Sequence, residues 1–234
     1  MTREYRQYRF TPPPGATDLL VIRHGESAPY REGHSVPTWH GHGDPELAPE
    51  GQQQAVRLAD RLAHDRIDAI YVTPLRRTSE TIAPLADRLG LTPVVEPDLR
   101  EVHLGEWEED GKFRRFTSEG HELALRMFAE QRWDVIPGAE STEDFTARIR
   151  RGISRIAAAH PDQRVVVVVH GGVIGALLST ATGAEGFAFV GADNASISQL
   201  VVAGDRWILR RFNDTAHLES MPVPSVPDQA AGAP

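Results

Sequence analysis

The sequence predicts an α/β fold, built as a three-layer α/β/α sandwich around a mainly parallel (mixed) sheet, with an inserted cap. Two apolar runs support this prediction, because residues 19–22 and 165–169 have the length and composition of buried strands. Segments with helical periodicity separate most of the predicted strands. This alternation is typical of parallel sheets that helices cover on both faces.

Each of the two apolar runs leads into a histidine and a glycine. The first run continues into Arg23, His24 and Gly25, and the second continues into His170 and Gly171. If both strands lie parallel in one sheet, their carboxyl ends share an edge, and neighbouring strands are about 4.8 Å apart. The sequence therefore predicts that two imidazoles and an arginine face one crevice.

The other elements follow from periodicity and from residues that begin or end helices. Residues 50–64 and 75–89 carry apolar residues at helical spacing, and Gly90 predicts the end of the second helix. Pro84 lies inside that helix and predicts a kink. A long helix begins at Ser141, whose hydroxyl is suited to capping its first turn. Further strands are predicted at residues 67–72, 92–95, 196–202 and 206–212, and further helices at residues 123–128 and 171–182.

The pattern predicts one main domain, over residues 18–218. Residues 1–17 mix arginine with aromatic residues before a run of prolines, which predicts an N-terminal arm. Residues 108–141 are more polar and less regular than the α/β segments on either side, so we expect them to form the cap. Residues 219–234 are rich in proline, alanine and glycine, which predicts a disordered tail.

Composition limits which classes of partner and which cellular compartment we expect. The chain has 234 residues, no cysteine and a formal net charge of -8. Bulk charge therefore argues against a nucleic acid or an anionic membrane as partner, and thiolate chemistry is excluded. The sequence begins without an apolar leader and lacks a run of about 18 apolar residues, so we expect a cytoplasmic protein. A homo-oligomer is compatible with the sequence, and the oligomeric state stays open.

A loop rich in glycine and proline follows the first strand, over residues 28–49. It carries His34, His40 and His42 close to Asp44, which is a set of side chains that could bind a metal. The loop lacks the helical or strand framework that fixes ligand geometry, so a solvated loop at the mouth of the site is favoured over a metal site.

Two further sets of charged residues fit phosphate chemistry. Arg76 and Arg77 lie at the start of a predicted helix, where free amide groups attract anions. Glu101, Glu106 and Glu108 lie close together, and one of them could protonate a leaving group if it stayed protonated. Residue chemistry alone does not choose between the arginines or among the acids.

These segments resemble a known family when they are taken together. Six blocks resemble, in order along the chain, the motifs of the histidine phosphatase superfamily, which includes cofactor-dependent phosphoglycerate mutases and broad acid phosphatases. The first block is Arg23-His24-Gly25-Glu26, and the last is Val169-His170-Gly171-Gly172. The resemblance covers roughly residues 18–214 and implies a phosphoglycerate mutase-like protein of the acid phosphatase branch. The other four blocks are residues 47–55, 73–81, 99–107 and 137–141.

The resemblance also assigns roles to residues. It implies that His24 is a nucleophile that becomes a phosphohistidine, and that Arg23, Arg77 and His170 hold the phosphoryl oxygens. It selects Glu101 as the acid that protonates the leaving group and then activates water. No metal and no cofactor are implied, because two arginines and a histidine supply positive charge. Further substrate contacts are implied at Gly25, Ser27 and Gly171.

Departures from the family motifs bear on the reaction. Tyr30 stands where the mutases have asparagine, Ala48 replaces a threonine, and Thr78 replaces an alanine. A mutase must protect its phosphoenzyme from water until the bound intermediate has reoriented. An altered pocket therefore favours hydrolysis. We therefore expect a phosphatase for a small phosphorylated metabolite, with a cofactor-dependent phosphoglycerate mutase as the alternative.

A non-catalytic phospholigand-binding module is the alternative of another class. A binding module needs neither a nucleophile nor an acid, so the retained His24, Glu101 and His170 argue against it. The sequence leaves the physiological substrate open. Arginines of the predicted cap would either recognise anionic parts of the substrate or lie on solvated helix faces, and they are Arg114, Arg115, Arg126 and Arg132.

Overall fold

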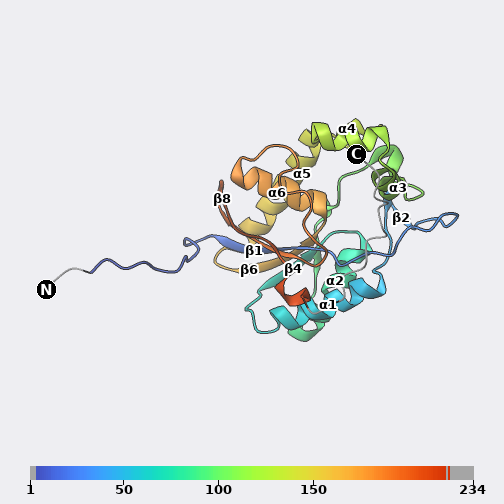
Figure 1. Cartoon of the computed structure of the whole chain (residues 1–234). Coiled ribbons are helices and arrows are strands. Elements are labelled where there is room, and N and C mark those ends of the chain that lie inside the picture. The colour runs from blue at the N-terminus through green and yellow to red at the C-terminus, as the bar shows by residue number, and fades with distance from the viewer. Residues whose placement is uncertain (1–3, 220, 222–234) are drawn as a thin grey trace.

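The computed structural model describes residues 4–219 and Met221, and its middle layer is a six-stranded sheet (Figure 1). The strands of this sheet are β1 (Thr17–Arg23), β4 (Ala69–Val72), β5 (Val94–Val95), β6 (Arg164–Val169), β7 (Ile197–Ala203) and β8 (Arg206–Asp214). Their order across the sheet is β5-β4-β6-β1-β7-β8. The strands that carry the two histidine motifs, β1 and β6, are therefore neighbours.

The pairing of β1 with β6 is parallel, and Arg23 lies opposite Val169. Strands β4 and β5 continue the parallel part of the sheet, whereas β7 and β8 are antiparallel to their neighbours. The prediction of a mainly parallel, mixed sheet is confirmed. Because both histidines follow directly after these paired residues, the sheet brings them to a common edge.

Helices cover both faces of the sheet, as Figure 1 shows. Helices α1 and α2 lie on one face, while α5 and α6 lie on the other, with α3 and α4 beyond them. Alternate residues of β1 enter two separate cores, because successive side chains of a strand point to opposite faces. Leu20 and Ile22 pack in the core under α1 and α2, and Leu19 and Val21 pack in the core under α5 and α6. The helices are α1 (Pro49–Leu62), α2 (Arg76–Leu89), α3 (Lys112–Glu119), α4 (Glu122–Glu130), α5 (Thr142–Ala159) and α6 (Gly171–Thr182).

Two helix ends lie at the residues where the sequence predicted them. Gly90 ends α2 in the left-handed conformation with φ 65°, which a residue without a Cβ adopts at little cost. The helix runs through Pro84. Ser141 caps α5 by accepting a hydrogen bond from the amide of Asp144. The predicted capping arrangement at the start of α5 is therefore present.

Two elements in the structure differ from the sequence prediction. Residues 28–49, expected to be mostly loop, contain a hairpin whose turn residues His40 and Gly41 both have positive φ, as a tight hairpin requires. Residues 112–119, expected to be irregular, form α3. The hairpin strands are too short to show a periodicity, and α3 has no residue that is fully buried. The hairpin consists of β2 (Thr38–Trp39) and β3 (His42–Gly43).

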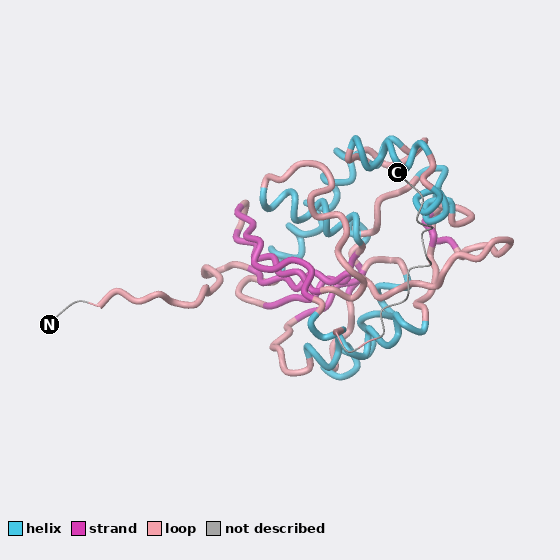
Figure 2. Tube along the Cα trace, in the orientation of Figure 1, coloured by secondary structure: helices cyan, strands magenta, loops and turns pink. Residues whose placement is uncertain are grey.

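The N-terminal part of the described chain lies at the end of β1 opposite to His24. Residues 4–10 form an extended arm that leaves the body at the start of β1, where Figure 2 shows it as a loop. Of the predicted tail, only Glu219 and Met221 belong to the described residues. Within the described chain, no helix has the length and apolar character that crossing a membrane requires.

Candidate active site

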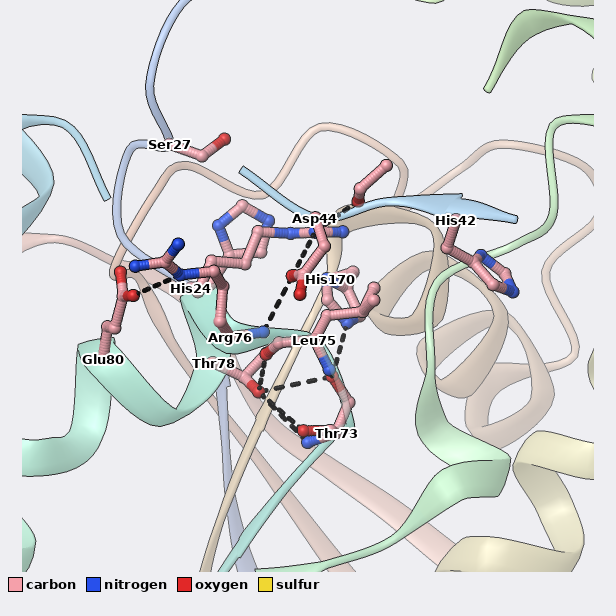
Figure 3. Close-up of polar contacts among 12 residues, drawn as sticks. His24, Ser27, His42, Asp44, Thr73, Leu75, Arg76, Thr78, Glu80 and His170 are labelled. Carbon is pink, nitrogen blue, oxygen red and sulfur yellow. Dashed lines mark hydrogen bonds and ion pairs between the residues drawn. The ribbon is translucent and has the colours of Figure 1, made fainter. Parts of the chain in front are cut away.

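The candidate active site is a cavity of about 400 Å³ at the carboxyl ends of β1 and β6. His24 follows β1 and His170 follows β6, and their ring centroids are 5.2 Å apart (Figure 3). The His24 amide also donates to the Val169 carbonyl, so the parallel pairing continues up to the site. The polar lining of the cavity includes Arg23, His24, Ser27, Arg77, Glu101 and Arg114.

One hydrogen bond fixes which nitrogen of His24 is reactive. The Nδ1 atom lies 2.7 Å from the carbonyl oxygen of Gly25, which can only accept a hydrogen bond. Nδ1 therefore carries the proton, and Nε2 has a free electron pair in the neutral ring. Burial, followed by the charges of Arg77 and Arg23, lowers the pKa of His24 well below 6.5. The imidazole is thus neutral and nucleophilic at neutral pH.

His170 is fully buried beside His24 and is oriented by Thr73. Its Nε2 atom lies 2.9 Å from the Thr73 hydroxyl oxygen, while its Nδ1 atom has no hydrogen-bond partner within the described residues. Burial and the charge of Arg77 lower the pKa of His170 well below 6.5. When Thr73 donates this bond, the neutral ring carries its proton on Nδ1.

Two arginines supply positive charge to the cavity. Arg77 is 8% exposed, and its Nη1 atom donates to the Gly43 carbonyl at 2.9 Å. Arg23 donates to the Ala192 carbonyl, and its buried Nε atom has no partner in the part of the chain that the structure describes. Burial lowers the pKa of both guanidinium groups and the charge of Glu101 raises it, but arginine keeps its charge at neutral pH.

The geometry separates Arg76 from Arg77. Arg76 points to the surface, where its guanidinium pairs with Glu80 at 2.7 Å and with Glu46 at 3.2 Å. Arg77, one residue further along α2, turns into the cavity instead. Adjacent residues on a helix point about 100° apart, so only one of the two can face the site.

The structure also separates the three glutamates among which the sequence could not choose the acid. Glu101 lines the cavity and accepts hydrogen bonds from the amides of Val102 at 3.0 Å and Gly172 at 3.1 Å. Burial raises the pKa of Glu101, although these hydrogen bonds and the charges of Arg77 and Arg23 oppose the shift. Glu108 lines the cavity but is engaged by the amides of Gly43 and Leu104. Glu106 is exposed at the surface.

The expected substrate contacts differ in their access to the cavity. Ser27 lines it, and the Ser27 hydroxyl accepts a hydrogen bond from Arg114 at 2.7 Å. The amide of Gly25 donates instead to the Thr81 hydroxyl at 2.8 Å. Gly171 lies against Arg23, because a Cβ on Gly171 would be 3.6 Å from the Arg23 Nε atom. Gly25 and Gly171 therefore support the residues that line the cavity.

Asn194 belongs to the site and was missed by the sequence analysis. Its side-chain amide donates to the main-chain carbonyl of His24 at 2.9 Å, and it lines the cavity. This contact holds the main chain at His24 from the side opposite to β6. Asn194 lies in a polar loop 170 residues further along the chain, and no local pattern there indicates chemistry.

The histidines of residues 28–49 are separated in the structure. His34 is exposed, whereas His42 is 4% exposed and lies 3.6 Å from Glu108. Burial and the neighbouring His103 lower the pKa of His42 to about 4. Among residues 4–219, no group of three or more histidines and acids is arranged to hold a metal ion.

The four arginines of the predicted cap have different surroundings. Arg114, on α3, lines the cavity and donates to Ser27 and to the Ala28 carbonyl. Arg115 lies over the ring of Phe116 instead. Arg126 and Arg132 form surface ion pairs, both with Glu130. Of these four, Arg114 is the one that faces the site.

Comparison with known proteins identifies the family. Residues 19–215 match the model of the histidine phosphatase superfamily (branch 1), and the chain belongs to this superfamily. It is accordingly a hydrolase of the phosphatase type. The expected acid phosphatase branch is wrong, because the matching model is that of branch 1. Short motifs around the catalytic edge identified the superfamily but did not distinguish its branches.

Individual relatives cover most of the chain. It is 34% identical over 207 residues to phosphoglycerate mutase-like protein 4 of Arabidopsis thaliana, covering 86% of this chain and 87% of the relative. It is 30% identical over 209 residues to the metal-independent phosphoserine phosphatase of the same plant, covering 88% of this chain and 84% of the relative. The native structure of a mycobacterial glucosyl-3-phosphoglycerate phosphatase is similar, with a TM-score of 0.68, 29% identity and coverage of 86% and 100%.

Proposed function

We propose that this protein is a phosphomonoester hydrolase that acts on a small phosphorylated metabolite through a phosphohistidine at Nε2 of His24, without a metal. The observation that carries the proposal is the hydrogen bond from His24 Nδ1 to the Gly25 carbonyl. It leaves Nε2 as the free nitrogen of a neutral ring, close to Arg23, the buried Arg77 and His170. This arrangement has the parts that phosphoryl transfer to nitrogen requires.

In the first step, His24 Nε2 attacks phosphorus. The N–P bond forms while the P–O bond to the leaving alcohol breaks, and protonated Glu101 gives its proton to the departing oxygen. Arg23, Arg77 and the Nδ1–H of His170 donate to the phosphoryl oxygens, where charge is spread in the transition state. The raised pKa of Glu101 supports its role as the acid.

In the second step, water cleaves the phosphoenzyme. Glu101, now a carboxylate, takes a proton from the attacking water as the O–P bond forms and the N–P bond breaks. Inorganic phosphate leaves, His24 returns to the neutral state, and Glu101 is protonated again. The two steps therefore close a catalytic cycle without any other proton donor.

The cavity favours a substrate whose organic part carries a second anionic group. Arg114 lies on the wall, and its charge helps to lower the pKa of His24, so the guanidinium acts within reach of the nucleophile. Tyr30, Val36 and Trp107 provide apolar surface beside it. Phosphoserine and glucosyl-3-phosphoglycerate, after which relatives are named, are phosphate esters that carry a carboxylate.

Phosphoglycerate mutase activity is the alternative, because one relative is named for its likeness to mutases. Tyr30 favours hydrolysis, since its ring packs against Gly111 of the α3 segment, where a Cβ would be 2.1 Å from the Tyr30 ring. An aromatic ring thus takes the place at which the mutase motif has a small amide side chain. The pocket is thereby reshaped relative to the mutase motif.

A phosphate-release screen over phosphorylated metabolites, run with excess chelator, tests the proposal. We expect turnover that survives chelation, with carboxylated phosphate esters among the best substrates. Turnover that requires both phosphoglycerate and its bisphosphate would show a mutase instead. Absence of turnover at every pH with every ester, while phosphate esters still bind, would show a binding module.

A further inference from the structure

Arg148 is a buried cation that the proposed chemistry does not use. It lies on α5, is 3% exposed, and contacts the segment of residues 98–101, which begins in a 3₁₀ turn and ends in Glu101. Its partner Glu140 belongs to the block of residues 137–141 that the family motifs singled out. This pair therefore links an otherwise unexplained motif to the residue proposed as the acid.

All five N–H groups of the Arg148 guanidinium have acceptors. Three of them donate to main-chain carbonyls, those of Asp98 and Arg100 at 2.7 Å each and that of Glu101 at 2.9 Å. The other two donate to the carboxylate of Glu140, from Nε at 2.6 Å and from Nη2 at 2.7 Å. A planar group with every donor engaged fixes direction as well as distance.

Glu140 reaches the far side of Glu101. Its amide donates to the His103 carbonyl at 2.9 Å, and its carboxylate accepts from the His103 amide at 3.3 Å. Burial alone would raise the pKa of Glu140, but the hydrogen bonds and charge of Arg148 lower it below its usual value. The pair is therefore ionised, and it ties the main chain on both sides of Glu101.

The carboxyl group of Glu101 has little room to move. Its two oxygens accept from the amides of Val102 and Gly172, and a Cβ on Gly172 would be 2.6 Å from the Glu101 Oε1 atom. A shift of the main chain at residues 98–101 would break these contacts or close the gap to α6. Glu101 can hold its position only while that segment is held.

We propose that Arg148, anchored by Glu140, is a positioning residue that holds Glu101 in place for proton transfer to the leaving group. This inference rests on the proposed role of Glu101 as the acid. The guanidinium acts through the main chain of residues 98–101, and it contacts no substrate. In the first step, which kcat/KM reports, its loss should therefore matter only for substrates whose leaving group needs a proton.

Arg148→Lys is the variant to measure, because lysine keeps the charge but cannot span five acceptors. Arg150→Lys is the matched control, since Arg150 lies on the same helix but packs over the ring of Trp207. We expect Arg148→Lys to lower kcat/KM for an alkyl phosphate about 10- to 100-fold, because small misplacement of a general acid has effects of this size. With p-nitrophenyl phosphate, whose leaving group needs no proton, we expect kcat/KM to stay within about twofold. The Arg150→Lys control should be unchanged with both substrates.

A double-mutant cycle with Glu101→Gln separates positioning from folding. If Arg148 acts through Glu101, Arg148→Lys should add no further loss on the alkyl ester in the Glu101→Gln background. Equal loss of kcat/KM with both esters, or additive losses, would overturn the inference while leaving the acid role of Glu101 intact. An equal loss of kcat/KM with both esters in Glu101→Gln would overturn the acid role, and the inference with it. If Arg148→Lys does not fold, Glu140→Gln carries the same test, because it keeps one acceptor and removes the charge.

Discussion

Thr73 and His170 are joined by a 2.9 Å hydrogen bond between the threonine hydroxyl and Nε2 of the ring. The Thr73 oxygen also accepts from the Leu75 amide at 3.3 Å and lies 3.3 Å from the Thr78 hydroxyl oxygen. The bond holds the ring of His170, and donation by Thr73 would place the proton of the neutral ring on Nδ1. That proton is the one proposed to meet a phosphoryl oxygen.

Thr73→Val should therefore reduce activity while keeping the shape of the side chain. We expect kcat/KM to fall about tenfold, equivalent to about 1.4 kcal/mol, because His170 loses the partner that orients its ring. Thr73→Ser retains the hydroxyl and should stay close to wild type. Steady-state kinetics on both variants, with melting temperatures as a check, would refute the role of the hydroxyl if serine and valine behaved alike.

Arg114 and Arg115 form a matched pair for the proposed substrate class. Arg114→Ala should raise KM for carboxylated phosphate esters about 10- to 100-fold, since a hydrogen bond to a charged group contributes about 1.5–3 kcal/mol. It should change KM for p-nitrophenyl phosphate much less, because that ester lacks a second anion. Arg115→Ala should leave both values unchanged. Equal loss on both esters in Arg114→Ala would show a structural role instead of substrate recognition.

The pH dependence should differ between substrates with good and poor leaving groups. Activity needs neutral His24, whose pKa is lowered, so the rate falls only when the pH drops well below 6.5. It also needs protonated Glu101, whose pKa is raised, so the rate with an alkyl ester falls again as the pH rises through that pKa. An alkyl ester should therefore give a bell-shaped profile of kcat/KM.

An ester with an activated leaving group should lack the high-pH fall, since it needs no acid. Glu101→Gln should remove the same fall with alkyl esters, because glutamine does not titrate. Profiles of kcat/KM against pH for both esters, on wild type and Glu101→Gln, provide the check. A high-pH fall that survives in Glu101→Gln would assign the acid role to a different residue.

The sheet edge and its histidines could be predicted from the sequence, because apolar runs of strand length end directly at His24 and His170. Parallel pairing of those runs then places the histidines together by geometry alone. The same reasoning could not choose among Glu101, Glu106 and Glu108, since the three share one chemistry. Only the fold separates them, by placing Gly172 of α6 beside Glu101.

Contacts between distant segments account for what the sequence did not show. Arg148 is one of several arginines on α5, and its acceptors lie about 50 residues earlier in the chain. The hairpin that meets Arg77 through the Gly43 carbonyl has strands of two residues each, too short to leave a pattern. Such positions are specified by tertiary packing and carry no periodic signal.

The central claim is that a phosphoryl group passes through Nε2 of His24. Rapid mixing with a phosphate-labelled activated ester, followed by an alkaline denaturing quench and peptide mapping, measures this directly, since phosphohistidine is labile to acid. We expect the label on the peptide that contains His24, its release by acid, and its absence in His24→Ala, with turnover lowered on the order of 10⁴-fold or more. His34→Ala, which removes an exposed histidine of the neighbouring loop, should label as wild type does. Label on a different residue, or undiminished turnover in His24→Ala, would contradict the account.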